Sequence, residues 1–360
     1  MSRRKLRLES LPAPSSGRKL AVLVLSLLAG FAAMSIVFAA NRVNPLFALK
    51  EILLRSFGSP YGLKETVTKA IPLILIGAGL TLAFRAKFWN IGAESQLLLG
   101  AMAATWVGLA WGPKLPAAAL LPLMFAAGFL AGAFWGLIPA LLRARFAVNE
   151  VISTLMLNYV AAELLTLLIT GPWRGASQRG FPYTEPLVAA AKLPLIPGTR
   201  IHYLTLAIAL AAAGLLYLAI YTTKFGYELR VLGENPEAAR YAGIDFLRTS
   251  VVLMVVSGGL AGLAGVGEAA GIHHRLTYPG VISAGYGFTA IIVAWLAKLN
   301  PLGTVVSGLL FAGILVGGDA IQISLGLPAA TVQVFNGVLL FFLIMGDFFI
   351  TRRLRFVRTG

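Results

Sequence analysis

Cysteine is absent from the 360 residues, and charged residues make up only 12% of them. Without cysteine, the chain can form no disulfide framework, thiol nucleophile or cysteine-ligated metal site. With so few charges, it cannot cover a soluble globule, because that needs a polar surface. The mean hydropathy is +0.83, and apolar stretches of about 20 residues recur, each long enough to cross the membrane as a helix. The composition predicts a helical membrane protein.

Signatures of catalysis are also missing. The sequence has no Gly-x-x-x-x-Gly-Lys-[Ser/Thr] loop to hold ATP phosphates and no His-Glu-x-x-His pattern for zinc. His273 and His274 are adjacent, so on a helix they would lie on different faces. We therefore expect no catalytic residue, no metal site and no cofactor, and a membrane enzyme is the weaker hypothesis.

Ten apolar segments predict an all-α fold with about ten transmembrane helices. The second and the eighth are shorter than a full span, which suggests broken or steeply buried helices there. The segments are residues 20–40, 70–84, 91–112, 117–142, 150–170, 201–222, 249–271, 284–299, 302–322 and 328–350.

The basic residues predict the orientation. If the N-terminus is cytoplasmic, nineteen of the 30 lysines and arginines fall in inner segments, and both termini lie inside. Membrane orientation therefore explains the net charge of +16 better than nucleic-acid binding does, since no basic groove with stacking aromatics can be assembled. The first span also resembles a cleaved signal peptide, but its apolar run is longer than the usual run of about 7–15 residues.

These predictions give one transmembrane domain, residues 20–350, between a basic cytoplasmic tail (1–19) and a second cytoplasmic tail (351–360). Residues 41–69 and 171–200 are expected outside the cytoplasm, the first as a helix at the membrane surface and the second as a proline-rich, mostly non-helical cap. Residues 223–248 form a cytoplasmic loop. Similar junctions at 90–94 and 283–287, the first expected to face inside and the second outside, suggest an inverted repeat of spans 2–5 and 7–10.

Polar residues inside the spans are the candidates for a solute pathway, because ionisable groups in the membrane usually face a bundle interior or a passage. On the fifth span, Glu150, Thr154 and Asn158 share one face. That stripe could line a pore or could join helices through hydrogen bonds. Glu163 lies nearly opposite Glu150, where a structural role is possible. The full set is Trp89, Asn90, Glu94, Gln96, Asn149, Glu150, Thr154, Asn158, Glu268 and Asp319.

The inner loop from Gly226 to Ile244 has the signals of a short capped helix. Asn235 can cap it, Pro236 suits its first turn and Gly243 can end it. A capped helix of mixed charge that projects into the cytoplasm is a docking element for a soluble partner. The residues expected to carry this coupling are Gly233, Asn235, Pro236, Glu237, Ala238, Ala239 and Gly243.

This loop resembles the coupling-helix loop of ABC importer permeases of the ribose and branched-chain amino acid type. The runs 83–96, 149–159 and 285–289 with 299–303 are similar to the motifs of the purine-nucleoside (simple sugar/nucleoside) permeases. The likeness covers most of residues 40–350. Lys87, Trp89 and Ser95 depart from the family pattern, which leaves the choice of substrate open.

The resemblance implies a permease subunit in the plasma membrane that translocates a nucleoside. It also implies partners: ABC ATPase subunits, a second homologous permease and an extracytoplasmic substrate-binding lipoprotein, in contact with membrane lipid but with no nucleic acid. Asn90, Glu94, Gln96 and residues 149–158 would lie near the pathway. A simple sugar or a branched-chain amino acid is the alternative solute, and an ion-coupled secondary transporter is the alternative mechanism.

Overall fold

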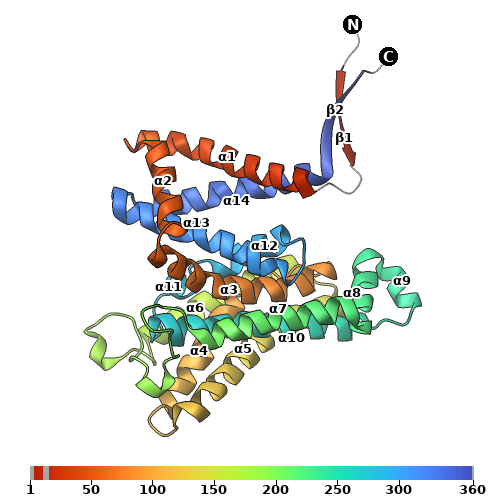
Figure 1. Cartoon of the computed structure of the whole chain (residues 1–360). Helices are drawn as coiled ribbons and strands as arrows, with labels where there is room; N and C mark the ends of the chain where they lie inside the picture. The colour runs from red at the N-terminus through yellow and green to blue at the C-terminus, as the bar shows by residue number, and fades with distance from the viewer. Residues whose placement is uncertain (1–3, 11–15, 359–360) are drawn as a thin grey trace. The chain divides into compact units, whose positions relative to one another are not determined.

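The computed structural model describes residues 4–10 and 16–358 (Figure 1). The chain divides into two compact units. The first contains residues 1–63 and 313–360, and the second contains residues 64–312. The boundaries fall inside helices α3 (Pro60–Arg85) and α13 (Gly303–Leu325), so each of these helices contributes residues to both units.

The first unit pairs the two ends of the chain. Helix α1 (Ser16–Ala40) packs along α14 (Ala329–Thr351), where a Cβ on Gly30 would lie 2.9 Å from Leu339. Helix α2 (Pro45–Ser56) follows a sharp bend after α1. The predicted tails pair as antiparallel strands, β1 (Arg4–Ser10) with β2 (Arg352–Arg358), while residues 1–3, 11–15 and 359–360 of those tails lie outside the described part.

The second unit contains the remaining elements. Its first half consists of most of α3, then α4 (Ala93–Trp111), α5 (Ala117–Phe146) and α6 (Glu150–Thr170). Its second half contains α7 (Tyr203–Thr222), α8 (Lys224–Glu234), α9 (Pro236–Tyr241), α10 (Phe246–Val266), the π-helix η3 (Gly267–His273), α11 (Pro279–Ser283) and α12 (Tyr286–Leu296). Between α6 and α7 the structure has two single 3₁₀ turns, η1 (Ala176–Gln178) and η2 (Ala189–Ala191).

Helices occupy all ten segments predicted from the sequence. By length and composition, seven of the described helices could cross a membrane, or eight if the bent pair α1–α2 counts as one span. The predicted number of about ten is therefore not confirmed. The second span is 26 residues long, not short as predicted, because its helix begins at Pro60 and includes Lys64, Glu65 and Lys69.

The eighth span is broken, as its short apolar run suggested. Helix α11 ends at Ser283, and α12 begins at Tyr286. Ala284 and Gly285 lie between them in the left-handed conformation, with φ of 45° and 72°. Successive left-handed residues cannot continue a right-handed helix, so the chain changes direction here and exposes the backbone N–H groups at the start of α12.

Glycines bring α4, α5 and α10 together at backbone distance. A Cβ on Gly262 of α10 would lie 2.1 Å from the carbonyl oxygen of Gly128 on α5, and one on Gly100 of α4 would lie 2.2 Å from that of Gly262. The same holds for Gly132, 2.2 Å from the oxygen of Gly258. Helices in a membrane gain stability from this packing, because lipid offers no hydrophobic drive for association.

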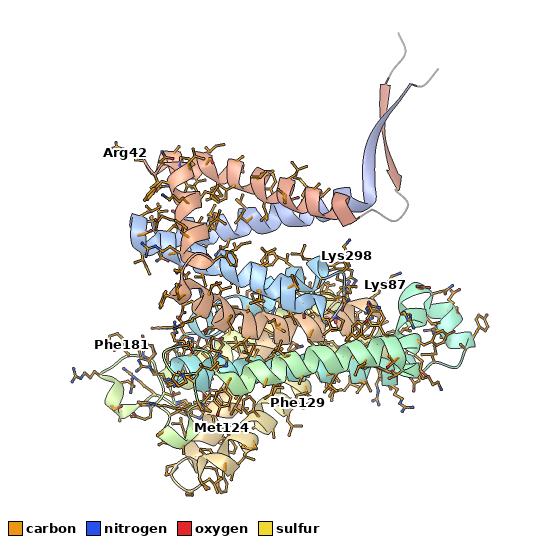
Figure 2. The ribbon with its side chains drawn as sticks, viewed as in Figure 1. Arg42, Lys87, Met124, Phe129, Phe181 and Lys298 are labelled. Carbon is orange, nitrogen blue, oxygen red and sulfur yellow. The ribbon has the colours of Figure 1, made fainter. Side chains whose placement is uncertain are left out.

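The segment between α6 and α7 covers one end of these helices. Leu187 and Leu193 are buried against a cluster that includes Met124 of α5 and Val266 of α10. The backbone N–H of Leu187 donates to the carbonyl oxygen of His274 at 2.8 Å. Figure 2 shows Phe181 of this segment at one end of the unit and Lys87 and Lys298 toward the other end, from which α8 and α9 project.

Replacement of Gly262 by alanine should destabilise the protein, since the new Cβ would overlap the Gly128 carbonyl. We expect a cost of about 1–3 kcal/mol and a lower unfolding midpoint in detergent. Gly214→Ala on α7 is the matched control, because nothing lies within 4 Å of its Cβ position. That variant should unfold at the original temperature or slightly above it. Equal midpoints for the two variants would contradict the packing described here.

Candidate functional site

A closed network of amides lies just before and within the first turns of α4. Asn90 is fully buried, and its Nδ2 donates to Gln96 Oε1 at 3.0 Å and to Ser257 Oγ of α10 at 3.1 Å. Its Oδ1 accepts from Gln96 Nε2 and from the backbone N–H of Gly92, both at 3.1 Å. Both hydrogens and the oxygen of the Asn90 amide are thus paired, as a buried polar group requires.

The polar stripe of α6 packs against the same segment. Asn158 Nδ2 donates to the carbonyl oxygen of Ile91 at 3.0 Å, and its Oδ1 accepts from the N–H of Ser95 at 3.1 Å. Thr154 Oγ1 accepts from the N–H of Ile91 at 3.3 Å and donates to the oxygen of Glu150 at 2.6 Å. These side chains satisfy the backbone groups around the start of α4, which is the helix-joining role that the sequence left open.

Glu150, the first residue of α6, forms a salt bridge with Arg143. Its Oε1 lies 2.6 Å from Nη1 of Arg143, the same nitrogen that donates to the carbonyl oxygen of Lys87 at 3.2 Å. The Arg143 guanidinium also stacks on Phe88, 4.6 Å from the ring centroid. The pair therefore holds the α5 end, the α6 start and the segment before α4 in one arrangement.

Glu94, in the first turn of α4, binds the start of α12. Its Oε2 accepts from the N–H of Gly287 at 2.8 Å, and the side chain is 8% exposed. A carboxylate at two helix N-termini is favourable, because the unpaired N–H groups there carry partial positive charge. The sequence predicted that the 90–94 and 283–287 junctions face opposite sides of the membrane. In the structure a hydrogen bond joins the two junctions at one depth, and the side that each one faces stays a prediction.

Trp89 lies in an aromatic stack. Its ring centroid is 5.7 Å from that of Trp295 on α12 and 5.5 Å from that of Phe84 on α3. Trp89 stays 39% exposed and Trp295 36% exposed. The stack therefore presents open aromatic edges beside the network.

The other three predicted pathway residues are not members of this network. Asn149 is exposed and caps α6 through the N–H of Val151. Glu268 is buried in the π-helix η3, with its Oε2 3.9 Å from His273 Nε2. Asp319 is exposed and belongs to the first unit. The structure thus brings together Trp89, Asn90, Glu94, Gln96, Glu150, Thr154 and Asn158.

His202, the residue before α7, is fully buried against Gly267 and Gly271 of η3. Neither ring nitrogen has a hydrogen-bond partner among the described residues. Burial, with a smaller contribution from the Arg200 charge, lowers the pKa of His202 to about 4. The imidazole is therefore neutral in the folded protein at neutral pH.

The predicted coupling residues form the expected short helix. Asn235 Oδ1 accepts from the N–H groups of Glu237 and Ala238 at 3.0 and 3.1 Å, so it caps α9. Gly243 follows with φ of 73°. Gly233 lies in the last turn of α8, where a Cβ would lie 2.1 Å from the carbonyl oxygen of Arg85. Ala239 is buried, and Tyr241 is 94% exposed at the end of α9.

Several functional contacts involve residues that the sequence did not single out. They are Ser257, Arg143 and Trp295, whose partners are Asn90, Glu150 and Trp89. Ser257 and Arg143 were visible as polar residues in or beside apolar helices. Their partners depend on how the helices pack, which periodicity does not reveal.

Glu94→Leu should leave the N–H of Gly287 without its acceptor. We expect a loss of about 1–3 kcal/mol in stability, because an unpaired buried donor has lost its solvation. Glu94→Gln retains an acceptor oxygen at the same position and should cost much less. Thermal unfolding of the purified variants measures both, and equal losses would show that the contact to α12 does not matter.

Acidification should destabilise the protein through His202. The unfolded imidazole binds a proton below its ordinary pKa of 6.5, whereas the folded one does so only near 4. The stability therefore falls as the pH drops from 6.5 towards 4, by roughly 2 kcal/mol at pH 5. His202→Phe should flatten the dependence of the unfolding midpoint on pH over this window. An unchanged slope would rule out His202 as its source.

The sequence of this chain is similar to those of several known proteins. A glucose ABC transporter permease protein of Haloferax volcanii is 39% identical over 337 residues, which cover 91% of this chain and 87% of that protein. A guanosine ABC transporter permease protein of Bacillus subtilis is 32% identical over 333 residues, which cover 90% and 92%. A nucleoside ABC transporter permease protein of Lactococcus lactis is 30% identical over 333 residues, which cover 91% of each chain.

Residues 62–344 match the family described as "Branched-chain amino acid transport system / permease component". This match spans the buried network, the broken α11–α12 helix and the capped helix α9. The apolar helices agree with a multi-pass protein of the plasma membrane. The chain therefore belongs to this family of ABC importer permeases and is a transporter subunit.

Proposed function

We propose that α9 receives the force of ATP hydrolysis from separate ATPase subunits. The support is its form: a helix capped by Asn235 that ends in Tyr241, an aromatic side chain 94% exposed. Large exposed aromatics are frequent anchors of protein interfaces. The sequence has no loop of its own for ATP phosphates, so hydrolysis belongs to the partner.

A line of contacts joins α9 to the buried network. Gly233, just before α9, packs on the backbone of Arg85, whose Nε donates to the carbonyl oxygen of Leu299 at 2.9 Å. The chain then runs from Arg85 to Trp89 and Asn90, which contact Glu150 and Ser257. A displacement of α9 would therefore move the segment before α4 and, through Glu94, the start of α12.

The solute that we propose is a nucleoside, delivered by an extracytoplasmic binding lipoprotein to this permease and a second, homologous one. Two relatives carry guanosine or nucleoside in their names, and the sequence motifs point the same way. A simple sugar is the second candidate, because the relative that is 39% identical is a glucose permease protein. Both solutes are uncharged and rich in hydroxyl groups.

Tyr241→Ala should weaken the attachment of the ATPase subunits while the permease still inserts and folds. Loss of a central aromatic anchor typically costs more than about 1 kcal/mol, or about fivefold in affinity. The measurements are co-purification of the ATPases and ATP-driven uptake in vesicles. Tyr203→Ala is the control, since Tyr203 is 45% exposed and begins α7, whose other end leads into this loop. Full coupling in the Tyr241 variant would refute the docking role.

A panel of unlabelled solutes separates the two candidates. Guanosine, adenosine, glucose, ribose and leucine would each compete with labelled guanosine for uptake by the assembled complex. We expect nucleosides to compete and leucine not to compete. Uptake of labelled glucose, with no uptake of labelled guanosine, would replace the nucleoside by the sugar. Uptake that continues without ATP but stops when ion gradients collapse would support the ion-coupled alternative.

A further inference from the structure

Helix α6 has two opposite faces with different surroundings. Its buried face contains Glu150, Thr154 and Asn158, then Ala161, Leu165 and Ile169. Its exposed face contains Ile152, Met156, Tyr159, Val160, Glu163 and Leu167. At about 100° per residue, the two sets centre on opposite sides of the helix. The polar stripe of Glu150, Thr154 and Asn158, which resembles a pore lining in the sequence, therefore faces other parts of the protein.

The exposed face contains a carboxylate near the middle of the span. Glu163 is three residues from Val160, the midpoint of Glu150–Thr170, which is about 4.5 Å along the helix axis. Glu163 is exposed, and Tyr159, one turn earlier on the same face, is 65% exposed. A charged side chain at this depth costs about 2.5–3.5 kcal/mol or more against lipid, so such groups usually face water or protein.

Helix α7 is a predicted span whose exposed face is apolar near its middle. Its most exposed large side chains near mid-span are Leu210, Leu215 and Leu218, at 45%, 67% and 54%. The span Tyr203–Thr222 contains no charged residue. Helix α6 differs at the same depth, because a carboxylate and a phenol hydroxyl share its exposed face. Lipid is thus a poor match for that face.

We infer that the α6 face with Tyr159 and Glu163 borders the aqueous passage through which solute crosses the membrane. This rests on the proposed function, because a transporter is what provides water at this depth. The Glu163 carboxylate would accept hydrogen bonds from solute hydroxyl or N–H groups, and the Tyr159 ring would stack on a flat base or the apolar side of a sugar. The site fits an uncharged solute with several donors and disfavours an anion.

The absence of cysteine makes the test direct, since every introduced thiol is the single one in the chain. Tyr159→Cys and Glu163→Cys variants of the complete complex, in membrane vesicles, are treated with a charged, water-soluble methanethiosulfonate. Thiols react as thiolates, which form in water and not in hydrocarbon. Both variants should react at least about tenfold faster than the Leu215→Cys control.

The controls match depth and exposure. Leu215 is 67% exposed, close to the 65% of Tyr159, and lies about 4 Å from the midpoint of α7. Ala161→Cys places a thiol on the buried face of α6, where Ala161 is 0% exposed, and should stay unreactive. An excess of transported solute should slow the labelling at 159 and 163. Rates equal to that of the Leu215 variant would overturn the inference and assign this face to lipid or to tight protein contact.

Uptake measured in the same vesicles keeps this test separate from the proposed function. If the wild-type complex imports nucleoside but neither introduced thiol reacts, the inference fails and the function stands. If both thiols react and a sugar slows their labelling whereas a nucleoside does not, the inferred passage is supported and the proposed solute becomes a sugar. Glu163→Gln adds a readout of binding: the solute concentration for half-maximal uptake should rise several-fold, with less effect on the maximal rate. No change in either value would remove Glu163 from solute recognition.

Discussion

The backbone contact of α4, α5 and α10 is the constraint on which the buried network depends. Gly128 and Gly132 of α5 meet Gly258 and Gly262 of α10 with no side chain between them. At this separation Ser257, the neighbour of Gly258, comes within 3.1 Å of Asn90. Larger residues at these glycines would push α10 away and leave the Asn90 amide without one of its partners. The close packing at the glycines is therefore also what brings the buried polar groups within hydrogen-bond distance of one another.

The polar residues around α4 solve a problem that the membrane creates. A helix that begins within the protein exposes N–H groups, and lipid offers no acceptor for them. Asn90, Thr154 and Asn158 bind backbone groups before and within the first turn of α4, while Glu94 binds the start of α12. The site is therefore ordered before any solute arrives. Such order suits the proposed transmission of movement from α9 better than it suits a flexible binding pocket.

The sequence predicts much of this fold, because long apolar runs and caps are local signals. The helix positions and the cap by Asn235 follow from them. The neighbour that a polar face meets is not local. Periodicity placed Glu150, Thr154 and Asn158 together, but nothing in it told whether that stripe faces water or α4. The start of the second span was missed for a related reason. Lys64, Glu65 and Lys69 interrupt the apolar run, yet Glu65 is 8% exposed within α3 and its Oε2 lies 3.2 Å from Nη1 of Arg200.

The sequence predicted only part of the break between α11 and α12. A short apolar run suggested it, whereas the left-handed backbone of Ala284 and Gly285 and the contact of Gly287 with Glu94 depend on the fold. The two similar junctions of the predicted repeat invited the idea of opposite membrane faces. Broken helices let both junctions reach the interior, where they meet.

The β1–β2 ribbon has a consequence for the path of the whole chain. Arg4 pairs with Arg358 and Leu8 with Leu354, so the beginning and the end of the described polypeptide are neighbours. Two strands joined by backbone hydrogen bonds lie on the same side of the membrane. The number of times that the chain between them crosses the membrane must therefore have even parity. Seven complete crossings violate that parity. Eight crossings, with the bent pair α1–α2 counted as one span, satisfy it.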